Sequence, residues 1–248
     1  MKEKIKMWAI SVLFAALLLG TVTVPASATD YYCFAEWVNN YAYPDQLKYN
    51  DENARGFYNQ LTSKTPWWGT YVYGNSQAEE RHWKDPSKSG SGIDYIYADN
   101  AHFAYFSGHG CPEGIAFSSS RDDTLLHYND ALWGNTKMDW ITLDACQVLQ
   151  ESTHENWENA FDGLHSMTGF HTACHDVPDR GTNFARRMDG TRTVQPVITA
   201  WFMAAKDTEP STTYAAALAP ESCWSDYVYG HGSQGTPGTV FKYEKRQC

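Results

Sequence analysis

Two mainly apolar runs in the middle of the chain each end in polar residues. The run at 101–106 (AHFAYF) is followed by SGHG at 107–110, and the run at 140–143 (WITL) is followed by DAC at 144–146. Short runs that are apolar throughout are typical of strands buried on both faces of a parallel sheet. Glycine allows a sharp turn and a close approach to the backbone. The pattern therefore predicts two buried strands that carry reactive side chains at their carboxyl ends.

The rest of the chain alternates between strand and helix patterns. Strand patterns occupy 30–38, 69–74 and 168–176, a hairpin is predicted around 114–120, and helix patterns occupy 51–61, 152–167, 182–188 and 194–206. We expect Asp51 to be the N-cap of the first helix and Ser152 or Thr153 that of the second. This alternation predicts an α/β fold with a mainly parallel central sheet and helices on both faces. After a removable segment at 1–28, residues 29–248 are expected to form a single domain.

The ligand site of such a sheet lies beyond the carboxyl ends of its strands. If the two central strands are adjacent and parallel, His109 and Cys146 face one crevice. A cysteine attacks as its thiolate, and an imidazole can take the proton at neutral pH. The backbone N–H groups of Gly110 and Cys146 could then stabilise an oxyanion. Asp144 lies two residues before Cys146, on the same side of the strand, where it would suit a cationic substrate side chain.

The first 28 residues have the layout of a secretory signal peptide. Three lysines precede an apolar run, and ASA at 26–28 resembles a cleavage site. We therefore expect a secreted, extracellular protein, with an uncleaved membrane anchor as the alternative, because the apolar character extends to about Val24. The formal charge of the whole chain is −10 and becomes more negative when the lysine-rich segment is removed, so nucleic acid is not an expected partner.

Six cysteines in a secreted chain predict disulfides by default. They are Cys33, Cys111, Cys146, Cys174, Cys223 and Cys248. If Cys146 is a free nucleophile, five remain and at least one more must be unpaired. We expect that one to be Cys111 or Cys174.

Taken together, the blocks YFSGHG and ITLDAC resemble those of the clan of caspase-like cysteine peptidases, which includes caspases, metacaspases, legumain, gingipains and clostripain. The resemblance implies a caspase-like three-layer sandwich with a Cys-His dyad, in which His109 is the general base and acid and Cys146 forms an acyl-enzyme. It implies a protein or peptide substrate, and it maps Asp144 onto an acidic residue of the primary specificity pocket, hence cleavage after Arg or Lys. Cys111 and the pair Gln147-Val148 depart from the clan's pattern. The blocks GFHTACHD and AWFMAA indicate a separate secreted family with this fold.

Other interpretations stay open. The same acyl-enzyme could be resolved by an amine, which would make the protein a transpeptidase or ligase. A different class of function is a non-catalytic extracellular binding module that uses the aromatic segments at 67–68, 71–73 and 224–230.

Metal or cofactor binding is not expected at the dyad. His171 and His175 would lie too far apart on a strand to share a zinc ion, although on a helix the same spacing would bring them together. Some members of the clan need calcium, for which Asp122 and Asp123 are candidate ligands, and the alternative for this acidic pair is a solvated turn.

Overall fold

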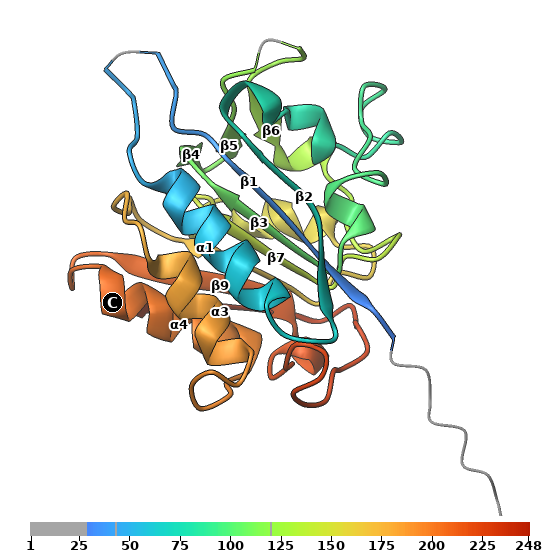
Figure 1. The fold of residues 1–248 in the computed structure, drawn as a ribbon. Coiled ribbons are helices and arrows are strands. Elements are labelled where there is room, and N and C mark those ends of the chain that lie inside the picture. The colour runs from blue at the N-terminus through green and yellow to red at the C-terminus, as the bar shows by residue number, and fades with distance from the viewer. Residues whose placement is uncertain (1–28, 43, 120) are drawn as a thin grey trace, which may run out of the picture.

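A seven-stranded sheet runs through the molecule, and five neighbouring strands in it are parallel (Figure 1). The computed structural model describes residues 29–248 except residues 43 and 120, so the expected signal peptide lies outside the described residues. The strands are β1 Tyr31–Trp37, β2 Trp67–Gly74, β3 Phe103–Ser107, β7 Trp140–Asp144, β8 Ser166–Phe170, β9 Tyr214–Pro220 and β10 Phe241–Gln247. Their order across the sheet is β10-β9-β8-β7-β3-β1-β2, and only β8–β9 and β9–β10 pair in antiparallel fashion. The prediction of an α/β fold with a mainly parallel sheet is confirmed.

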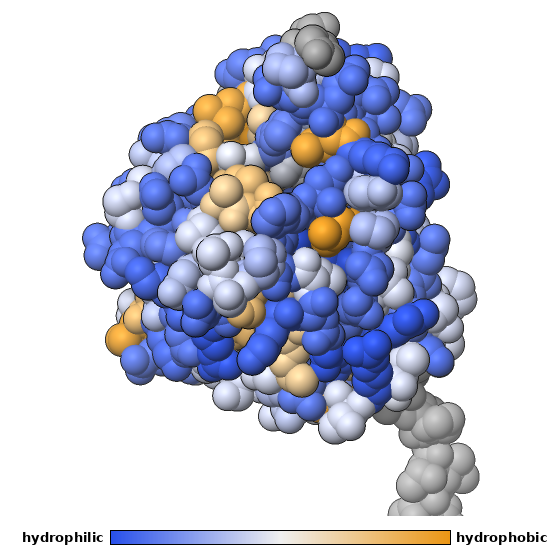
Figure 2. Space-filling view, turned by 90° about the vertical axis from the view of Figure 1, so that its left-hand side faces the viewer, coloured by the Kyte–Doolittle hydropathy of each residue, from blue (hydrophilic) through white to orange (hydrophobic). Residues whose placement is uncertain are grey.

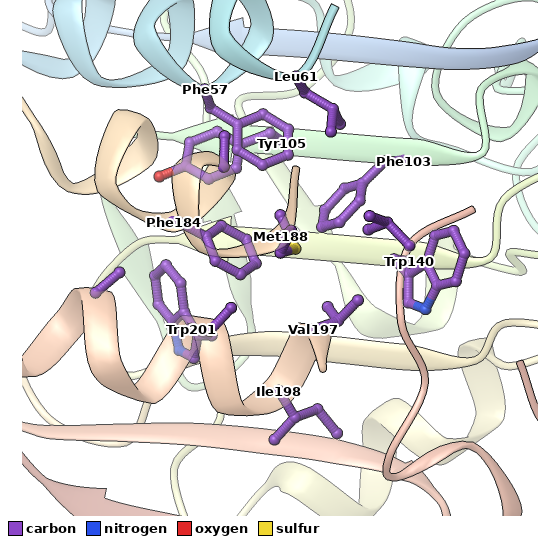
Figure 3. Packing of buried hydrophobic residues seen from close by; sticks show 14 of the residues in the cluster. Phe57, Leu61, Phe103, Tyr105, Trp140, Phe184, Met188, Val197, Ile198 and Trp201 are labelled. Carbon is purple, nitrogen blue, oxygen red and sulfur yellow. The ribbon is translucent and has the colours of Figure 1, made fainter. Parts of the chain in front are cut away.

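Three helices cover one face of the sheet: α1 Asn50–Thr62, α3 Arg180–Met188 and α4 Val197–Thr208. Beneath them, aromatic side chains from helices and strands pack into one core (Figure 3). Phe57 of α1 stacks on Tyr105 of β3 with ring centroids 4.4 Å apart, and Phe184 of α3 contacts both Phe57 and Trp201 of α4. These contacts hold α1 and α3 over the strand that leads to His109.

The opposite face has little helix. It is covered by α2 His154–Trp157, by several short 3-10 turns and by a small antiparallel sheet of β4 Gly110–Cys111, β5 Gly114–Ala116 and β6 Leu125–His127. Buried indoles, Trp83, Trp133 and Trp157 among them, fill the space between these elements and the main sheet. The expected hairpin around 114–120 is confirmed in β4–β5–β6, whereas the long helices of the described residues, α1, α3 and α4, all lie on the other face.

The segment 152–176 differs most from the expectation. Helix α2 ends at Trp157 and is followed by a 3-10 turn at Glu158–Ala160, and the chain then turns at Gly163 with φ +111°. A Cβ at Gly163 would lie 2.6 Å from the carbonyl oxygen of Gly134, so this close approach requires glycine and the helix cannot continue through it. The next strand, β8, begins at Ser166 and ends at Phe170, so the predicted strand at 168–176 is wrong beyond residue 170.

Two smaller differences concern the N-cap of α1 and the last strand of the sheet. Tyr49, not Asp51, is the N-cap of α1, and Asp51 instead lies in the first turn, where it accepts a hydrogen bond of 2.7 Å from Asn39. The antiparallel pair β9–β10 was not anticipated, because the edge strand β10 reads FKYEKRQ and lacks the apolar character of the central strands.

In the part of the chain that the structure describes, no helix has the length and apolar character needed to cross a bilayer.

Candidate active site

Strands β3 and β7 are adjacent and parallel, and they end level with each other. Ser107, the last residue of β3, pairs with Asp144, the last residue of β7. Two residues further along each chain come His109 and Cys146, and both line the same cavity. The structure thus brings together the two residues that the sequence placed at separate strand ends.

His109 is held by the loop that follows β1. Its backbone N–H donates to the hydroxyl of Tyr41 at 2.9 Å, and the Tyr41 ring lies 4.4 Å from the imidazole ring. Its Nε2 lies 2.7 Å from the carbonyl oxygen of Asp45. Because a carbonyl can only accept, Nε2 carries a hydrogen, and the neutral ring then has its lone pair on Nδ1. The histidine is therefore oriented with one nitrogen free to accept a proton.

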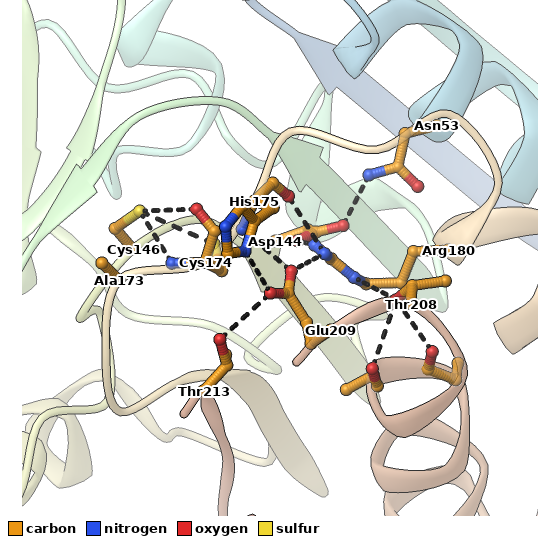
Figure 4. A network of polar contacts seen from close by, with 12 residues as sticks. Asn53, Asp144, Cys146, Ala173, Cys174, His175, Arg180, Thr208, Glu209 and Thr213 are labelled. Carbon is orange, nitrogen blue, oxygen red and sulfur yellow. Dashed lines mark hydrogen bonds and ion pairs between the residues drawn. The ribbon is translucent and has the colours of Figure 1, made fainter. Parts of the chain in front are cut away.

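The Cys146 thiol is in contact with a second cysteine, Cys174. The two Sγ atoms are 3.6 Å apart, and the backbone N–H of Cys174 donates to Cys146 Sγ at 3.3 Å (Figure 4). The Cys174 thiol, the Cys174 backbone N–H and the charge of His109 together lower the pKa of Cys146 to about 6, against an opposing effect of burial. The pKa of Cys174 is raised, chiefly by the same sulfur–sulfur contact and by its burial. Of the two thiols, Cys146 is therefore the more acidic.

Gly110 lies against the nucleophile segment. A Cβ at this position would come within 2.8 Å of the Ala145 Cβ, the Cys146 carbonyl oxygen and the Val148 side chain. The N–H of Ala116 on β5 donates to the carbonyl of His109, and hydrogen-bonded pairs alternate along an antiparallel ladder. The N–H of Gly110 consequently points away from β5.

The chain turns sharply straight after the nucleophile. Gln147 has φ 60°, one of two positive values among the non-glycine residues that the structure describes. Its N–H donates to the carbonyl of Thr172 at 3.0 Å, which ties the turn to the loop that follows β8. Cys146 thus sits at a constrained bend between two strands.

Asp144 does not offer a free carboxylate, so the sequence-based view of it as an open binding group is wrong. It is 3% exposed and forms an ion pair of 2.5 Å with Arg180 at the start of α3. Its other oxygen accepts hydrogen bonds from Asn53 at 2.5 Å and from the Tyr105 hydroxyl at 2.8 Å. A buried carboxylate needs such partners, because an unpaired charge is costly in the interior.

Arg180 connects this carboxylate to the loop that carries Cys174. Its guanidinium also pairs with buried Glu209 and donates to the carbonyl of His175 at 3.0 Å (Figure 4). Glu209 in turn accepts from the His175 backbone N–H at 2.9 Å and lies 2.8 Å from its Nδ1. The network fixes the loop at 171–179 against the end of β7, and with it the position of the second thiol.

The cavity that contains these groups is small. Its volume is about 70 Å³, and its lining residues are Leu47, Asn50, Gly108, His109, Asp144, Cys146, Cys174, His175, Asp176 and Arg180. A wider hollow of about 620 Å³ adjoins the other side of His109 and Gly110 and is lined by Tyr41, Asp45 and Phe117. Figure 2 shows the side of the molecule toward which the parallel strands point; it is mainly hydrophilic, with separate hydrophobic spots. His109 lines both cavities.

None of the six cysteines forms a disulfide, so the default expectation of disulfides is wrong for this structure. The 3.6 Å between the sulfurs of Cys146 and Cys174 exceeds the S–S bond length of about 2.05 Å. Cys33 and Cys223 are buried thiols, and burial raises the pKa of Cys223 to about 11.

The candidate calcium ligands already surround a cation of the protein. Lys84 Nζ lies 3.1 Å from both Asp122 and Asp123 and 2.5 Å from Glu80, and the lysine side chain is buried. Glu80, Asp122 and Asp123 place potential metal-ligand atoms within 4.8 Å of one another, and the ammonium group of Lys84 lies among them.

The two histidines considered for zinc lie on a loop, and each has its own partner. His171 Nδ1 accepts from the backbone N–H of Glu151 at 3.1 Å, and His175 pairs with Glu209. Elsewhere, His165, Cys223 and Asp226 place potential ligand atoms within 4.8 Å of one another. The His165 ring is already hydrogen-bonded to Asp226 at 2.6 Å, which accounts for its burial without an ion.

Sequence reasoning missed the partners of the dyad. Cys174, Arg180 and Glu209 come from segments after β8 and from α3 and the end of α4, and no local motif marks them. One signal was available: an aspartate at the end of an apolar strand needs a buried cation, and Arg180 lies just before the helix pattern at 182–188.

Comparison with known proteins identifies the family of the chain but gives no activity. No curated protein matches the chain. A family described as "Domain of unknown function (DUF6345)" matches residues 35–242, which include both strands of the site, His109, Cys146, Cys174 and Arg180. The chain belongs to the DUF6345 family.

Proposed function

We propose that this protein is a secreted cysteine endopeptidase with a caspase-like arrangement, in which Cys146 is the nucleophile and His109 the general base and acid. The observation that carries the proposal is the thiol of Cys146, with its pKa lowered to about 6, in one cavity with an oriented imidazole. Strongly shifted pKa values in a cleft are typical of functional sites. A structural cysteine in an apolar core would have its pKa raised instead.

The reaction that these groups support is acyl transfer. The Cys146 thiolate attacks the scissile carbonyl carbon, and the N–H groups of Gly110 and Cys146 stabilise the negative charge on the oxygen. His109, protonated at that stage, gives its proton to the departing amine. It then takes a proton from the water that hydrolyses the acyl-enzyme.

Preference for Arg or Lys before the cleaved bond is not part of the proposal. Its basis was a free carboxylate at Asp144, and Arg180 neutralises that group. Resolution of the acyl-enzyme by an amine, giving a transpeptidase or ligase, uses the same groups and remains the variant of this proposal.

Hydrolysis of a peptide library by the mature protein tests the proposal. We expect turnover by the wild type and its loss in Cys146→Ala and His109→Ala, while Cys111→Ser, which alters a half-buried thiol that does not line the cavity, retains it. Products joined to an added amine nucleophile would identify the transpeptidase variant. Equal turnover in the wild type and in Cys146→Ala would refute the assignment.

An aromatic surface on the edge strand β2 favours a second candidate, a binding module. Trp68 and Tyr71 on this strand are 53% and 40% exposed. The Tyr71 ring lies 5.5 Å from Tyr73 and 5.1 Å from Tyr97. Exposed aromatic rings are used to stack on apolar ligand faces. Depletion of the protein from solution by an insoluble polysaccharide, reduced in Trp68→Ala and unaffected in Cys146→Ala, would support this candidate, and an absence of depletion would remove it.

The proposed export rests on residues 1–28 alone, which lie outside the described residues. Amino-terminal sequencing of protein recovered from the medium is expected to begin at Thr29 if the segment is cleaved after Ala28.

A further inference from the structure

Cys146 and Cys174 have the asymmetry of a thiol–disulfide exchange pair. In such pairs the attacking cysteine has a lowered pKa and access to solvent, and its partner is more shielded and keeps its proton. Both thiols line the cavity, and the backbone N–H of Cys174 donates to Cys146 Sγ at 3.3 Å. The pKa of Cys146 is lowered to about 6, whereas that of Cys174 is raised. Peptide hydrolysis as proposed above needs only one of these thiols.

The sulfur atoms of Cys146 and Cys174 are close enough to form a disulfide after a small movement. The sulfurs are 3.6 Å apart, so they must approach by about 1.5 Å to reach the S–S bond length. The two cysteines lie on the segments that leave the neighbouring strands β7 and β8. These segments are joined by hydrogen bonds of 3.0 Å from Gln147 N to Thr172 O and from Leu149 N to Phe170 O. These backbone hydrogen bonds therefore keep Cys146 and Cys174 next to each other.

We propose that Cys146 and Cys174 form a reversible disulfide by exchange with a low-molecular-weight disulfide, with Cys146 as the attacking thiol and Cys174 as the resolving thiol. This second activity does not depend on peptide hydrolysis. The oxidised form lacks the nucleophile, so exchange and hydrolysis exclude each other.

The exchange balances in two steps. The Cys146 thiolate attacks one sulfur of the small disulfide RSSR, forms the mixed disulfide Cys146–SR and releases one RS⁻. Cys174 then loses its proton, to solvent or to the unprotonated nitrogen of His109, attacks Cys146 Sγ and releases the second RS⁻. Overall, two protein thiols are oxidised to one disulfide and RSSR is reduced to two RSH.

The test uses the mature protein, first reduced and then freed of reductant. It is treated with oxidised glutathione at pH 7, the remaining thiols are alkylated, and the peptides are analysed by mass spectrometry without reduction. We expect a linked peptide pair containing Cys146 and Cys174 and no alkylation of either residue. Added reduced glutathione should restore both thiols.

Two variants separate the steps. In Cys174→Ser, glutathione should remain on Cys146, because nothing resolves the mixed disulfide, whereas Cys111→Ser should form the linked pair as the wild type does. In Cys146→Ser, Cys174 should react with glutathione much more slowly than Cys146 does in the wild type, because its burial still raises its pKa. A stable glutathione adduct on Cys146 of the wild type, with Cys174 still open to alkylation, would overturn the proposal, as would an absence of reaction at Cys146.

The outcome is independent of the peptidase assignment. His109→Ala should lose hydrolysis but still form the linked pair. Hydrolysis by the wild type without any linked pair would leave the peptidase standing and exclude the exchange.

Discussion

Ser107 lies directly opposite Asp144 on the neighbouring parallel strand. This backbone register brings His109 and Cys146 to one cavity although 37 positions separate them in the sequence. The site is therefore a property of how β3 and β7 pair, and side chains added by later segments adjust its chemistry.

Replacing Gly110 with alanine should disturb the nucleophile segment. The new Cβ would lie 2.8 Å from backbone and side-chain atoms of residues 145–148, so we expect a loss of about 1–3 kcal/mol in the free energy of unfolding. Urea denaturation measures the loss, and alkylation of Cys146 in the folded variant shows whether the thiol has moved.

Gly90→Ala is the matched control, because a Cβ there meets nothing within 4 Å. We expect it to change stability by no more than about 0.5 kcal/mol. Equal stabilities for the two variants would mean that a Cβ at position 110 does not clash with residues 145–148.

The buried cation at Arg180 is expected to be essential for the fold around the site. Arg180→Met leaves the carboxylates of Asp144 and Glu209 without their charged partner, which typically costs about 3–5 kcal/mol. Arg246→Met removes an exposed arginine that pairs with Glu244 and should cost no more than about 1 kcal/mol. Chemical denaturation of both variants compares the two costs, and a cost below about 1 kcal/mol for Arg180→Met would contradict the network described here.

Calcium should not stabilise the protein through Asp122 and Asp123. The ammonium group of Lys84 already lies among those carboxylates, and a divalent ion would have to displace it. Thermal melting with and without millimolar calcium should give the same midpoint. A saturable rise in the melting temperature that disappears in Asp122→Asn would show that calcium enters this cluster.

Cys174 should influence the acidity of Cys146 more than His109 does. The Cys174 thiol is the largest cause of the lowered pKa, and the charge of His109 is a smaller one. In Cys174→Ala the pH at which Cys146 becomes reactive should therefore rise, because the thiolate loses a donor and needs a higher pH to form. An iodoacetamide rate profile for Cys174→Ala that matches the wild type would refute this ranking.

The sequence predicted the framework of the site because two strand ends could be recognised from local patterns. The strands β3 and β7, which come from the runs that lead into SGHG and DAC, are buried throughout, as continuously apolar strands are, and their polar ends lie at one edge of the sheet. Register and adjacency were assumed from the general behaviour of parallel sheets, and the structure has both.

The partners of the site could not be predicted because they depend on contacts between distant segments. Asp144 meets Arg180 across 36 positions and Cys146 meets Cys174 across 28. The loop at 171–179 follows β8 without a turn signal in the sequence, and its course is set by polar contacts with Arg180 and Glu209. The predicted helix at 152–167 also cannot pass Gly163, for a reason visible only in three dimensions, the contact of Gly163 with Gly134.

The pH dependence of Cys146 alkylation, measured in the wild type and in His109→Ala, tests whether Cys146 is a nucleophile activated by its neighbours in the site. Peptide mass spectrometry assigns the label to Cys146, and Cys111→Ser removes the background of a second half-buried thiol. We expect the alkylation rate to rise through a midpoint near pH 6 in the wild type, because the thiolate forms there. In His109→Ala the midpoint should move to a higher pH. A wild-type midpoint near the ordinary cysteine value of about 8.5, or an unreactive Cys146, would contradict this activation.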